Sequence, residues 1–331
     1  MTATDISPLF SVIIPTRNRA ALFAVALQSV LDQRFPAVEV IVVHDGSAPA
    51  HLAEYQTLLD SAPPHVRWLS LMPTERGHGQ SYALNFGVAH AQGAYVCFLD
   101  DDDQWIDPDH LGRVAGVISV EQKPVDLILA NQRAFQDGKA VDRVIWIEDL
   151  QPRIGRAPGP TGVYSVTVSD LLACQAHCHL NTTIVRRSFY LEIGGMDEGL
   201  RWECDRDFYL RAIDRTDVIR FLPQVVSRHN IPDPTARSSM TTSESELSRR
   251  LYQLRVFDKA VLFSVRPELR HYAMHQRTYS LDHIAAAARL AGRTDCALHY
   301  RAAALMARVT TAYLGLADGL RARFKAALRE R

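Results

Sequence analysis

Short apolar runs alternate with amphipathic segments along the first 130 residues. Runs rich in β-branched residues predict buried strands, and apolar residues spaced by three and four predict the helices between them. The expected strands are residues 10–14, 38–43, 66–71, 95–99 and 125–130, and the expected helices are residues 20–31, 51–59, 81–91 and 108–120. Because these strands are almost entirely apolar, we expect an α/β fold whose mostly parallel sheet carries helices on both faces.

The regular alternation ends near Asn131. The turn signal Asp137-Gly138 and several prolines follow, and we expect a hairpin and a loop up to residue 162. The elements expected next are a strand at 181–185, helices at 188–193 and 205–213, short strands at 218–221 and 225–229, and a polar loop at 230–245. From residue 246, helix formers dominate and predict three helices. We therefore expect one domain over residues 1–240 and a helical extension over residues 241–331.

Composition narrows the class of protein. The 37 Lys and Arg residues balance 37 Asp and Glu residues, so charge gives no reason to expect nucleic acid as a partner. Five cysteines form no regular framework, which favours a reducing cytosol. The first ten residues lack the basic and apolar regions of a signal peptide, and no apolar run is long enough to span a bilayer. We expect a soluble, cytoplasmic protein.

Four consecutive carboxylates, Asp100 to Asp103, directly follow the expected strand at 95–99. Adjacent negative charges repel one another, most strongly at the edge of a buried sheet. Ligands of open α/β sheets bind at the carboxyl ends of strands, where this cluster lies. A divalent cation such as Mg²⁺ or Mn²⁺ is the simplest compensation, since it takes carboxylate and phosphate oxygens. The alternative is a solvated acidic turn before the next helix, with Asp107 as its N-cap.

Three ordered motifs resemble those of family-2 glycosyltransferases, which have the GT-A fold, a Rossmann-like nucleotide-sugar-binding sheet. Residues 11–19, SVIIPTRNR, are similar to the family's first strand and loop. Residues 42–47, VVHDGS, are similar to its second-strand motif. Residues 79–103 are similar to the long signature that leads into its metal-binding D-x-D. The resemblance extends from Phe10 to His229 and leaves the helical extension outside.

The resemblance implies a donor half over residues 10–130 and an acceptor half over residues 131–240. The implied donor is a UDP-, GDP- or dTDP-sugar, and the implied cofactor is Mn²⁺ or Mg²⁺. Asp45 would accept a hydrogen bond from the nucleotide base, and Asp102 would ligate the metal. The donor-binding residues that the resemblance implies are Pro15, Thr16, Arg19, Asp45, Gly79, Gln80, Ser81, Asp100 and Asp101.

The sequence departs from the family pattern at two donor-side positions. His44 stands where the family often has a second Asp, and this difference bears on which nucleotide base the site recognises. Leu84 stands where many members carry an Arg before Asn85, which leaves more of the diphosphate charge to the metal. In the polar loop at 230–245, Arg237 with Ser238 and Ser239 is a separate candidate for closing over the diphosphate.

A second acidic segment, around Glu203 and Asp205, resembles the acceptor side of the family, where a Glu-Asp pair opens a helix. Alignment on Asp207 and Arg211 places Cys204 at the Glu position and Asp205 at the Asp position. A hydroxyl is a poor nucleophile, and a positioned carboxylate can take its proton. Asp205 is therefore the candidate catalytic base, with Glu203 as the fallback. The alternative is that Asp205 only caps the helix.

Histidines supply further candidates. His229 follows the last expected strand. In some related enzymes a His near this place ligates the metal or meets the diphosphate, so His229 is a candidate metal ligand, and an ordinary surface histidine is the alternative. His179 and Asn181 are candidates for acceptor contacts. Cys174 and Cys178 lie near histidines but lack the spacing of a zinc finger, so we do not expect structural zinc.

The last twelve residues, Leu320 to Arg331, interleave basic and apolar side chains in a helical pattern. Such a helix can lie on an anionic membrane surface, so peripheral contact with the inner face of the membrane is one hypothesis. A solvated helix end is the simpler interpretation. Packing of the helical extension on the catalytic domain, or on a second copy in a homodimer, explains its apolar positions.

The function that these features favour is inverting transfer of a sugar from a nucleotide-diphosphate donor to the hydroxyl of a glycan or glycoconjugate acceptor. The first alternative is a nucleotidyltransferase that makes nucleotide sugars, which needs a Gly-rich loop after strand one. Residues 15–19 lack that richness in glycine. The second alternative is a non-catalytic binding protein of the same fold, supported only by Cys204.

Overall fold

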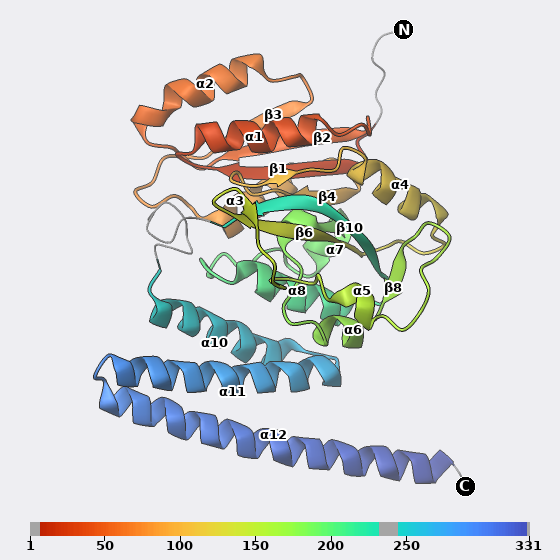
Figure 1. Ribbon diagram of the computed structural model, residues 1–331, viewed down its shortest axis with the longest axis vertical. Helices are drawn as coiled ribbons and strands as arrows, with labels where there is room; N and C mark the ends of the chain where they lie inside the picture. The colour runs from red at the N-terminus through yellow and green to blue at the C-terminus, as the bar shows by residue number, and fades with distance from the viewer. Residues whose placement is uncertain (1–6, 232–243, 330–331) are drawn as a thin grey trace. The chain divides into compact units, whose positions relative to one another are not determined.

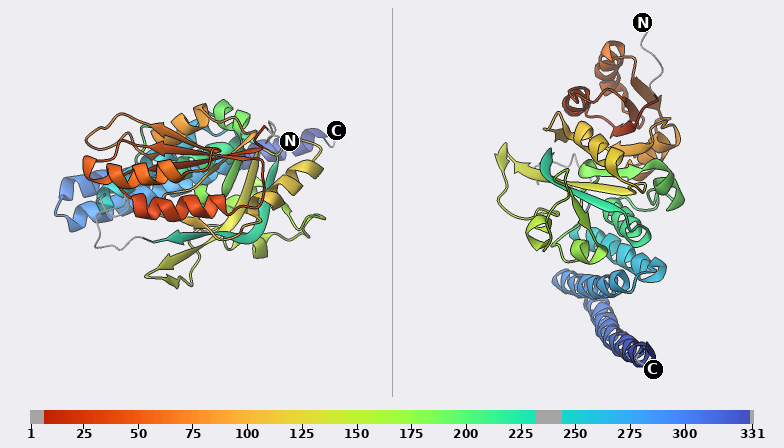
Figure 2. Two further views of the ribbon diagram at one scale, coloured as in Figure 1. Left: turned by 90° about the horizontal axis from the view of Figure 1, so that it is seen from above. Right: turned by 90° about the vertical axis from the view of Figure 1, so that its right-hand side faces the viewer.

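The structure, a computed structural model, describes residues 7–231 and 244–329. The chain divides into two compact units, residues 1–242 and residues 243–331. The larger unit contains the sheet with helices on both sides, and the smaller unit is helical (Figures 1 and 2). Each unit is described by itself.

The first half of the sheet is parallel, as expected. Its strands are β1 (Phe10–Thr16), β2 (Val38–His44), β3 (Val66–Ser70) and β4 (Tyr95–Phe98). β1 lies between β2 and β4, and β3 lies beyond β2. The connecting helices are α1 (Ala20–Leu31), α2 (Leu52–Ser61), which a short 3-10 turn η1 (Pro49–His51) precedes, and α3 (Gln80–Ala89). All four strands therefore end at the same edge of the sheet.

The second half of the sheet is mixed. β9 (Thr183–Arg186) runs antiparallel between β4 and β6 (Leu127–Gln136). β10 (Ile219–Asn230) is parallel to β6 and pairs with two short antiparallel strands, β5 (Gln104–Trp105) and β8 (Tyr164–Val166). β7 (Lys139–Ala140) closes the expected hairpin with β6. Among the described residues of this unit, the remaining helices are α4 (His110–Val120), α5 (Leu150–Arg153), α6 (Val168–Leu172), η2 (Leu180–Thr182), α7 (Arg187–Glu192) and α8 (Cys204–Arg215).

Several local expectations need correction. The two short strands expected at 218–221 and 225–229 are one strand, β10, with irregular register between Leu222 and Ser227. Pro223 interrupts the pattern in sequence, but the strand continues through an irregularity, which can absorb a proline. The helix expected from residue 108 begins at His110, and its N-cap is Asp109 rather than Asp107. The strands β5 and β8 and the helices α5 and α6 are too short for a periodic pattern to predict.

Apolar layers on both faces hold the sheet. On one face, Val12 and Ile14 of β1 pack in a cluster with Phe23 of α1. On the other face, Gly87 of α3 comes so close to β1 that an added Cβ would lie 2.5 Å from Ile13 Cγ2. Because α3 lies directly against the strand, its first turn is fixed beside the strand ends.

The smaller unit contains the three expected helices, α10 (Glu246–Phe263), α11 (Pro267–Leu290) and α12 (Thr294–Arg329). Leu281 of α11 packs with Ala304 and Ala307 of α12. Another face of α12 is exposed and apolar, with the residues Leu298, Leu305, Met306, Val309 and Tyr313 each at least 60% exposed. Within the described part of the chain, no helix has the length and apolar character needed to cross a bilayer.

Candidate active site

The predicted donor-side residues gather where β1, β2 and β4 end. Arg19 follows β1, Asp45 follows β2, and the acidic loop Asp100–Asp103 follows β4 (Figure 1). Gln80 opens α3 beside them and donates a hydrogen bond from Nε2 to Asp100 Oδ1 at 2.6 Å. The parallel topology, which the sequence pattern predicted, brings these distant residues to one edge.

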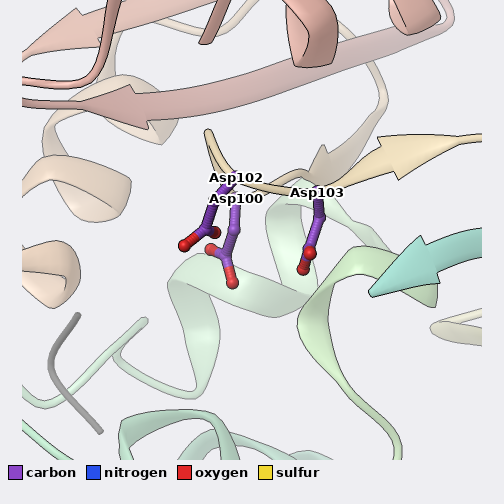
Figure 3. Close-up of side chains that lie close together, drawn as sticks. All are labelled: Asp100, Asp102 and Asp103. Carbon is purple, nitrogen blue, oxygen red and sulfur yellow. The ribbon is translucent and has the colours of Figure 1, made fainter. Parts of the chain in front are cut away.

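Three carboxylates of the acidic loop come together. Oxygens of Asp100, Asp102 and Asp103 all lie within 4.8 Å of one another, and Figure 3 shows the three side chains on the same side of the loop. Burial, followed by the charges of Asp103 and Asp102, raises the pKa of Asp100 well above its usual value. Burial also raises the pKa of Asp102, although Arg19 opposes the rise. The loop therefore holds negative charge at a cost, as the sequence suggested.

Arg19 is the cation that faces this loop most directly. Its guanidinium lies 2.7 Å from Asp101 Oδ1 and 2.5 Å from Asp102 Oδ2. Asp101 is almost fully buried, and burial raises its pKa to about 7 even though the charge of Arg19 lowers it. Arg19 thus compensates part of the acidic charge, a pairing that the sequence did not reveal.

Asp103 differs from its neighbours because protein donors occupy both of its oxygens. Oδ2 accepts hydrogen bonds from Asn181 Nδ2 at 2.5 Å and His229 Nδ1 at 2.7 Å, and Oδ1 accepts one from the backbone N–H of Asn230 at 2.7 Å. Asp103 therefore ties the acidic loop to β10 and to the segment before β9. Asp100 and Asp102 are left as the pair best placed to face a ligand.

This donor set suits a hard divalent cation. Asp100 and Asp102 supply carboxylate oxygens in a D-x-D pattern, and the raised pKa values of both show that positive charge at this place would be favourable. His229, the other predicted ligand, uses Nδ1 on Asp103, and its role at a metal stays a prediction. The described residues contain one group that could hold a metal, and Cys174 and Cys178 are not part of it.

Asp45 shapes the glycine loop at residues 77–79. Its Oδ1 accepts hydrogen bonds from the backbone N–H and Nδ1 of His78, and its Oδ2 accepts one from the backbone N–H of Gly79. Gly77 has φ +68°, and an added Cβ would lie 2.7 Å from Asp45 Oδ2. The backbone can approach the carboxylate this closely only with glycine. The predicted contact of Asp45 with a nucleotide base stays a prediction.

Two other donor-side candidates, Thr16 and Ser81, are held by hydrogen bonds inside the protein. Thr16 shares a 2.6 Å hydrogen bond with the Tyr55 hydroxyl, and Ser81 donates one to the backbone oxygen of Leu200 at 3.2 Å. Both side chains are buried, which gives them supporting contacts inside the protein. Pro15 lies within β1 next to Thr16.

The two departures from the family pattern are also accounted for. Leu84 is a fully buried core residue, so its position offers no cation to the site. His44 is buried and shares a 2.7 Å hydrogen bond with Ser47 Oγ, and burial lowers its pKa although the charge of Asp45 opposes this. Arg237, Ser238 and Ser239 lie outside the described residues.

Trp146 packs against two of the candidate histidines, His229 and His179. The ring of Trp146 lies edge-on to His229 at 4.9 Å and to His179 at 5.8 Å between centroids. His179 Nε2 is 3.8 Å from Asp100 Oδ2, and Asn181 Oδ1 accepts a hydrogen bond from the backbone N–H of Asp100. Burial, and then the charge of His229, lowers the pKa of His179 to about 4. For His229, burial works to lower the pKa, but the hydrogen bond and charge of Asp103 raise it overall.

Asp205, the predicted base, lies in the first turn of α8. It accepts hydrogen bonds from His177 Nε2 at 2.9 Å and from the backbone N–H of Arg206 at 2.8 Å. Burial works to raise its pKa, but the charge and hydrogen bond of His177 and the charge of His179 hold the pKa well below its usual range. Glu203, the fallback, has φ +62° and pairs with Arg206 at 2.5 Å. Cys204 is a buried thiol.

Two residues of this site were missed at the sequence level. Trp146 lies in a segment read only as part of a loop, and no spacing linked it to the histidines. His177 is one of the histidines beside Cys174 and Cys178, and the sequence weighed that group only as a zinc pattern, although His177 lies two residues before the candidate His179. The segment 177–181 contacts both Asp205 and the acidic loop, so it joins the two halves of the site.

Several known proteins are similar to this chain in sequence. Residues 11–167 match the model of the family described as Glycosyl transferase family 2. A PGL/p-HBAD biosynthesis glycosyltransferase of Mycobacterium bovis (strain BCG / Pasteur 1173P2) is 27% identical over 280 residues, which cover 82% of this chain and 96% of that protein. The putative teichuronic acid biosynthesis glycosyltransferase TuaG of Bacillus subtilis (strain 168) is 37% identical over 105 residues, 31% of this chain and 39% of that protein.

Solved structures show the same fold. TarS 1-349 of S. aureus in complex with UDP matches with a TM-score of 0.59 at 19% identity, over 82% of this chain and 70% of that one. The mannosyltransferase PcManGT of Pyrobaculum calidifontis in complex with GDP-Man and Mn2+ matches with a TM-score of 0.56 at 20% identity, over 95% of this chain and 88% of that one.

Proposed function

Because this chain belongs to glycosyl transferase family 2, we propose that it moves a sugar from a nucleotide-diphosphate donor to an acceptor hydroxyl with inversion at the anomeric carbon. The observation that carries this proposal is the Asp100-x-Asp102 pair at the end of β4, next to Arg19 and the glycine loop. The donor class is a UDP-, GDP- or dTDP-sugar, in line with the ligands of the two structural neighbours.

A divalent cation, Mn²⁺ or Mg²⁺, fits the carboxylate oxygens of Asp100 and Asp102. When bound, such an ion neutralises charge that develops on a departing diphosphate. Arg19, already within 2.7 Å of Asp101 and Asp102, would share that charge. The backbone of Gly79, which Asp45 fixes, leaves room beside the donor because it carries no side chain.

The acceptor side is formed by Asp205, His179 and Asn181. Asp205 is ionised at neutral pH because its pKa is held low, so it can accept a proton from the attacking hydroxyl. Attack from this side, opposite the departing nucleotide, gives inversion. Glu203 is a weaker candidate base, since Arg206 already pairs with its carboxylate.

The acceptor that we propose is a glycan or glycoconjugate, as the names of several relatives indicate for those proteins.

For the helical unit, we propose peripheral contact with a membrane surface. Residues 243–331 contain 16 Lys and Arg against 8 Asp and Glu, an excess of eight positive charges. This charge favours an anionic lipid surface over a second copy of the same unit, which it would repel. The exposed apolar residues of α12 provide the surface that would enter the headgroup region.

The experiment is a turnover panel. The protein is incubated with UDP-, GDP- and dTDP-sugars, with Mn²⁺ or with EDTA, and the free nucleoside diphosphate is measured. We expect slow hydrolysis of one donor class that EDTA abolishes and that Asp102→Asn reduces by about 100-fold or more. The proposal would be contradicted if nucleoside monophosphate were released in place of nucleoside diphosphate. It would also be contradicted if no donor released nucleoside diphosphate in the presence of the metal.

A further inference from the structure

His177 and Asp205 form a hydrogen-bonded pair on the acceptor side of the site. Nε2 of His177 lies 2.9 Å from Oδ2 of Asp205. The His177 side chain is 13% exposed and the Asp205 side chain 24% exposed, so the carboxylate is the more accessible partner. Histidine therefore backs the carboxylate from inside the protein, much as one member of a triad orients another.

The remaining contacts of His177 leave Nε2 as the ring nitrogen that reaches a polar partner. Its Nδ1 is buried and has no hydrogen-bond partner among the described residues, and its ring packs against Tyr209. Nε2 carries the hydrogen of the 2.9 Å hydrogen bond, because an ionised carboxylate can only accept.

Asp205 has few other groups to fix its rotamer. Among the described residues, its Oδ1 accepts a hydrogen bond only from the backbone N–H of Arg206 in its own turn. The neighbouring position, Cys204, carries a thiol instead of a second carboxylate. Its Sγ lies 3.8 Å from Gln80 Oε1. The groups that face Asp205 from other elements are His177 and His179, both from the segment before β9.

We propose that His177 is a positioning residue for the base: its Nε2–H holds the Asp205 carboxylate turned toward the acceptor hydroxyl. This inference rests on the proposed function, since it takes Asp205 as the base. The proton of the acceptor hydroxyl passes to Asp205 as the new C–O bond forms and the bond to the nucleoside diphosphate breaks. His177 neither gains nor loses a proton in that step.

Three variants test the pairing on the full chain. His177→Phe removes the donor, His177→Gln keeps an N–H donor at a similar reach, and Cys174→Ala is a matched control in the same segment that does not contact Asp205. The probe reaction is hydrolysis of the donor that turns over fastest in the panel, with its kcat, its KM and the pH dependence of kcat. Thermal unfolding of each variant is measured beside it.

We expect His177→Phe to lower kcat by about 10- to 100-fold with the KM for the donor unchanged, as loss of an orienting partner does elsewhere. The acid limb of the pH profile should move to higher pH, because burial still raises the pKa of Asp205 while the hydrogen bond that lowered it is gone. His177→Gln should recover most of the rate, and Cys174→Ala should match the wild type.

Two outcomes would overturn this inference. One is a wild-type kcat and pH profile in His177→Phe, and the other is a His177→Gln variant as slow as His177→Phe while both unfold at the wild-type temperature. The variant Asp205→Asn distinguishes failure of this inference from failure of the proposed function. If Asp205→Asn is inactive and His177→Phe is not impaired, only the positioning role fails. If Asp205→Asn retains full turnover, the base assigned under the proposed function fails as well.

Discussion

The guanidinium of Arg19 joins two neighbouring carboxylates of the acidic loop, with Asp102 Oδ2 at 2.5 Å from one nitrogen and Asp101 Oδ1 at 2.7 Å from another. A fixed cation thus touches the carboxylate that we assign to the metal. Arg19 and a divalent ion would repel each other there, yet both would be attracted by a diphosphate.

This contact predicts that Arg19 weakens metal binding in the absence of donor. Arg19→Gln should bind Mn²⁺ more tightly than the wild type, by about tenfold, because the competing positive charge is removed. Electron paramagnetic resonance of free Mn²⁺ measures this without any turnover. Arg19→Lys keeps the charge and serves as the control. Weaker Mn²⁺ binding by Arg19→Gln would show that the guanidinium supports the ion rather than competes with it.

Two aspartates of the same loop should respond differently to the same substitution. Asp103 accepts three hydrogen bonds from protein groups, so Asp103→Asn should lower the free energy of unfolding by about 2 kcal/mol or more. Asp102→Asn relieves repulsion in the loop and should change stability by less than about 1 kcal/mol while it abolishes metal binding. Urea unfolding and Mn²⁺ titration of both variants check this. Equal loss of stability in the two variants would contradict the division of roles.

His110 should make the fold sensitive to acid. It is buried, neither ring nitrogen has a hydrogen-bond partner among the described residues, and burial lowers its pKa to about 4. The folded pKa lies below the unfolded value, so the unfolded state takes up the proton first. Stability is therefore complete above pH 6.5 and falls as the pH drops from 6.5 toward 4, by up to about 3 kcal/mol.

A leucine at this position would not titrate. His110→Leu should flatten the loss of stability between pH 6.5 and 4, and the exposed His65→Gln should leave it unchanged. Urea unfolding across this pH range measures the slope. A His110→Leu variant with the full wild-type slope would place the acid sensitivity elsewhere.

The charged helical unit predicts binding to anionic vesicles. The full chain should sediment with vesicles that contain phosphatidylglycerol but not with phosphatidylcholine vesicles, and salt should weaken the binding. Leu305→Ser with Val309→Ser should reduce it several-fold, because both side chains are about 60% exposed on α12. Leu22→Ser, an exposed apolar residue of α1, is the control. Light scattering of the wild type and the double variant gives their oligomeric states. If no vesicle binds and the wild type is a dimer that the double variant disrupts, a second copy occupies this surface.

Much of the fold followed from the sequence because its first half is regular. The apolar runs at 10–14, 38–43 and 95–99 predicted parallel strands, and the acidic loop was therefore expected at their carboxyl ends. The irregular second half was harder to predict. Strands of two or three residues, such as β5 and β8, depend on tertiary pairing with β10 and leave no periodic pattern.

The sequence predicted candidate residues for the site but not the contacts that these residues make. Spacing and resemblance gave Asp100, Asp102 and Asp205 as candidates, but the partners of these side chains come from other segments. Arg19 lies 83 residues from Asp102, and His177 lies 28 residues from Asp205. No local pattern encodes such pairs, since they arise only when the strands and helices pack.

The most direct test of the account is the position of manganese in crystals soaked with Mn²⁺ and the nucleoside diphosphate that the turnover panel selects. Anomalous scattering at the manganese edge should show a peak within about 2.2 Å of oxygens of Asp102 and of the diphosphate, a distance typical of hard cations with oxygen ligands. A bound nucleotide with no manganese beside Asp100 and Asp102 would contradict the central claim that these carboxylates hold the ion.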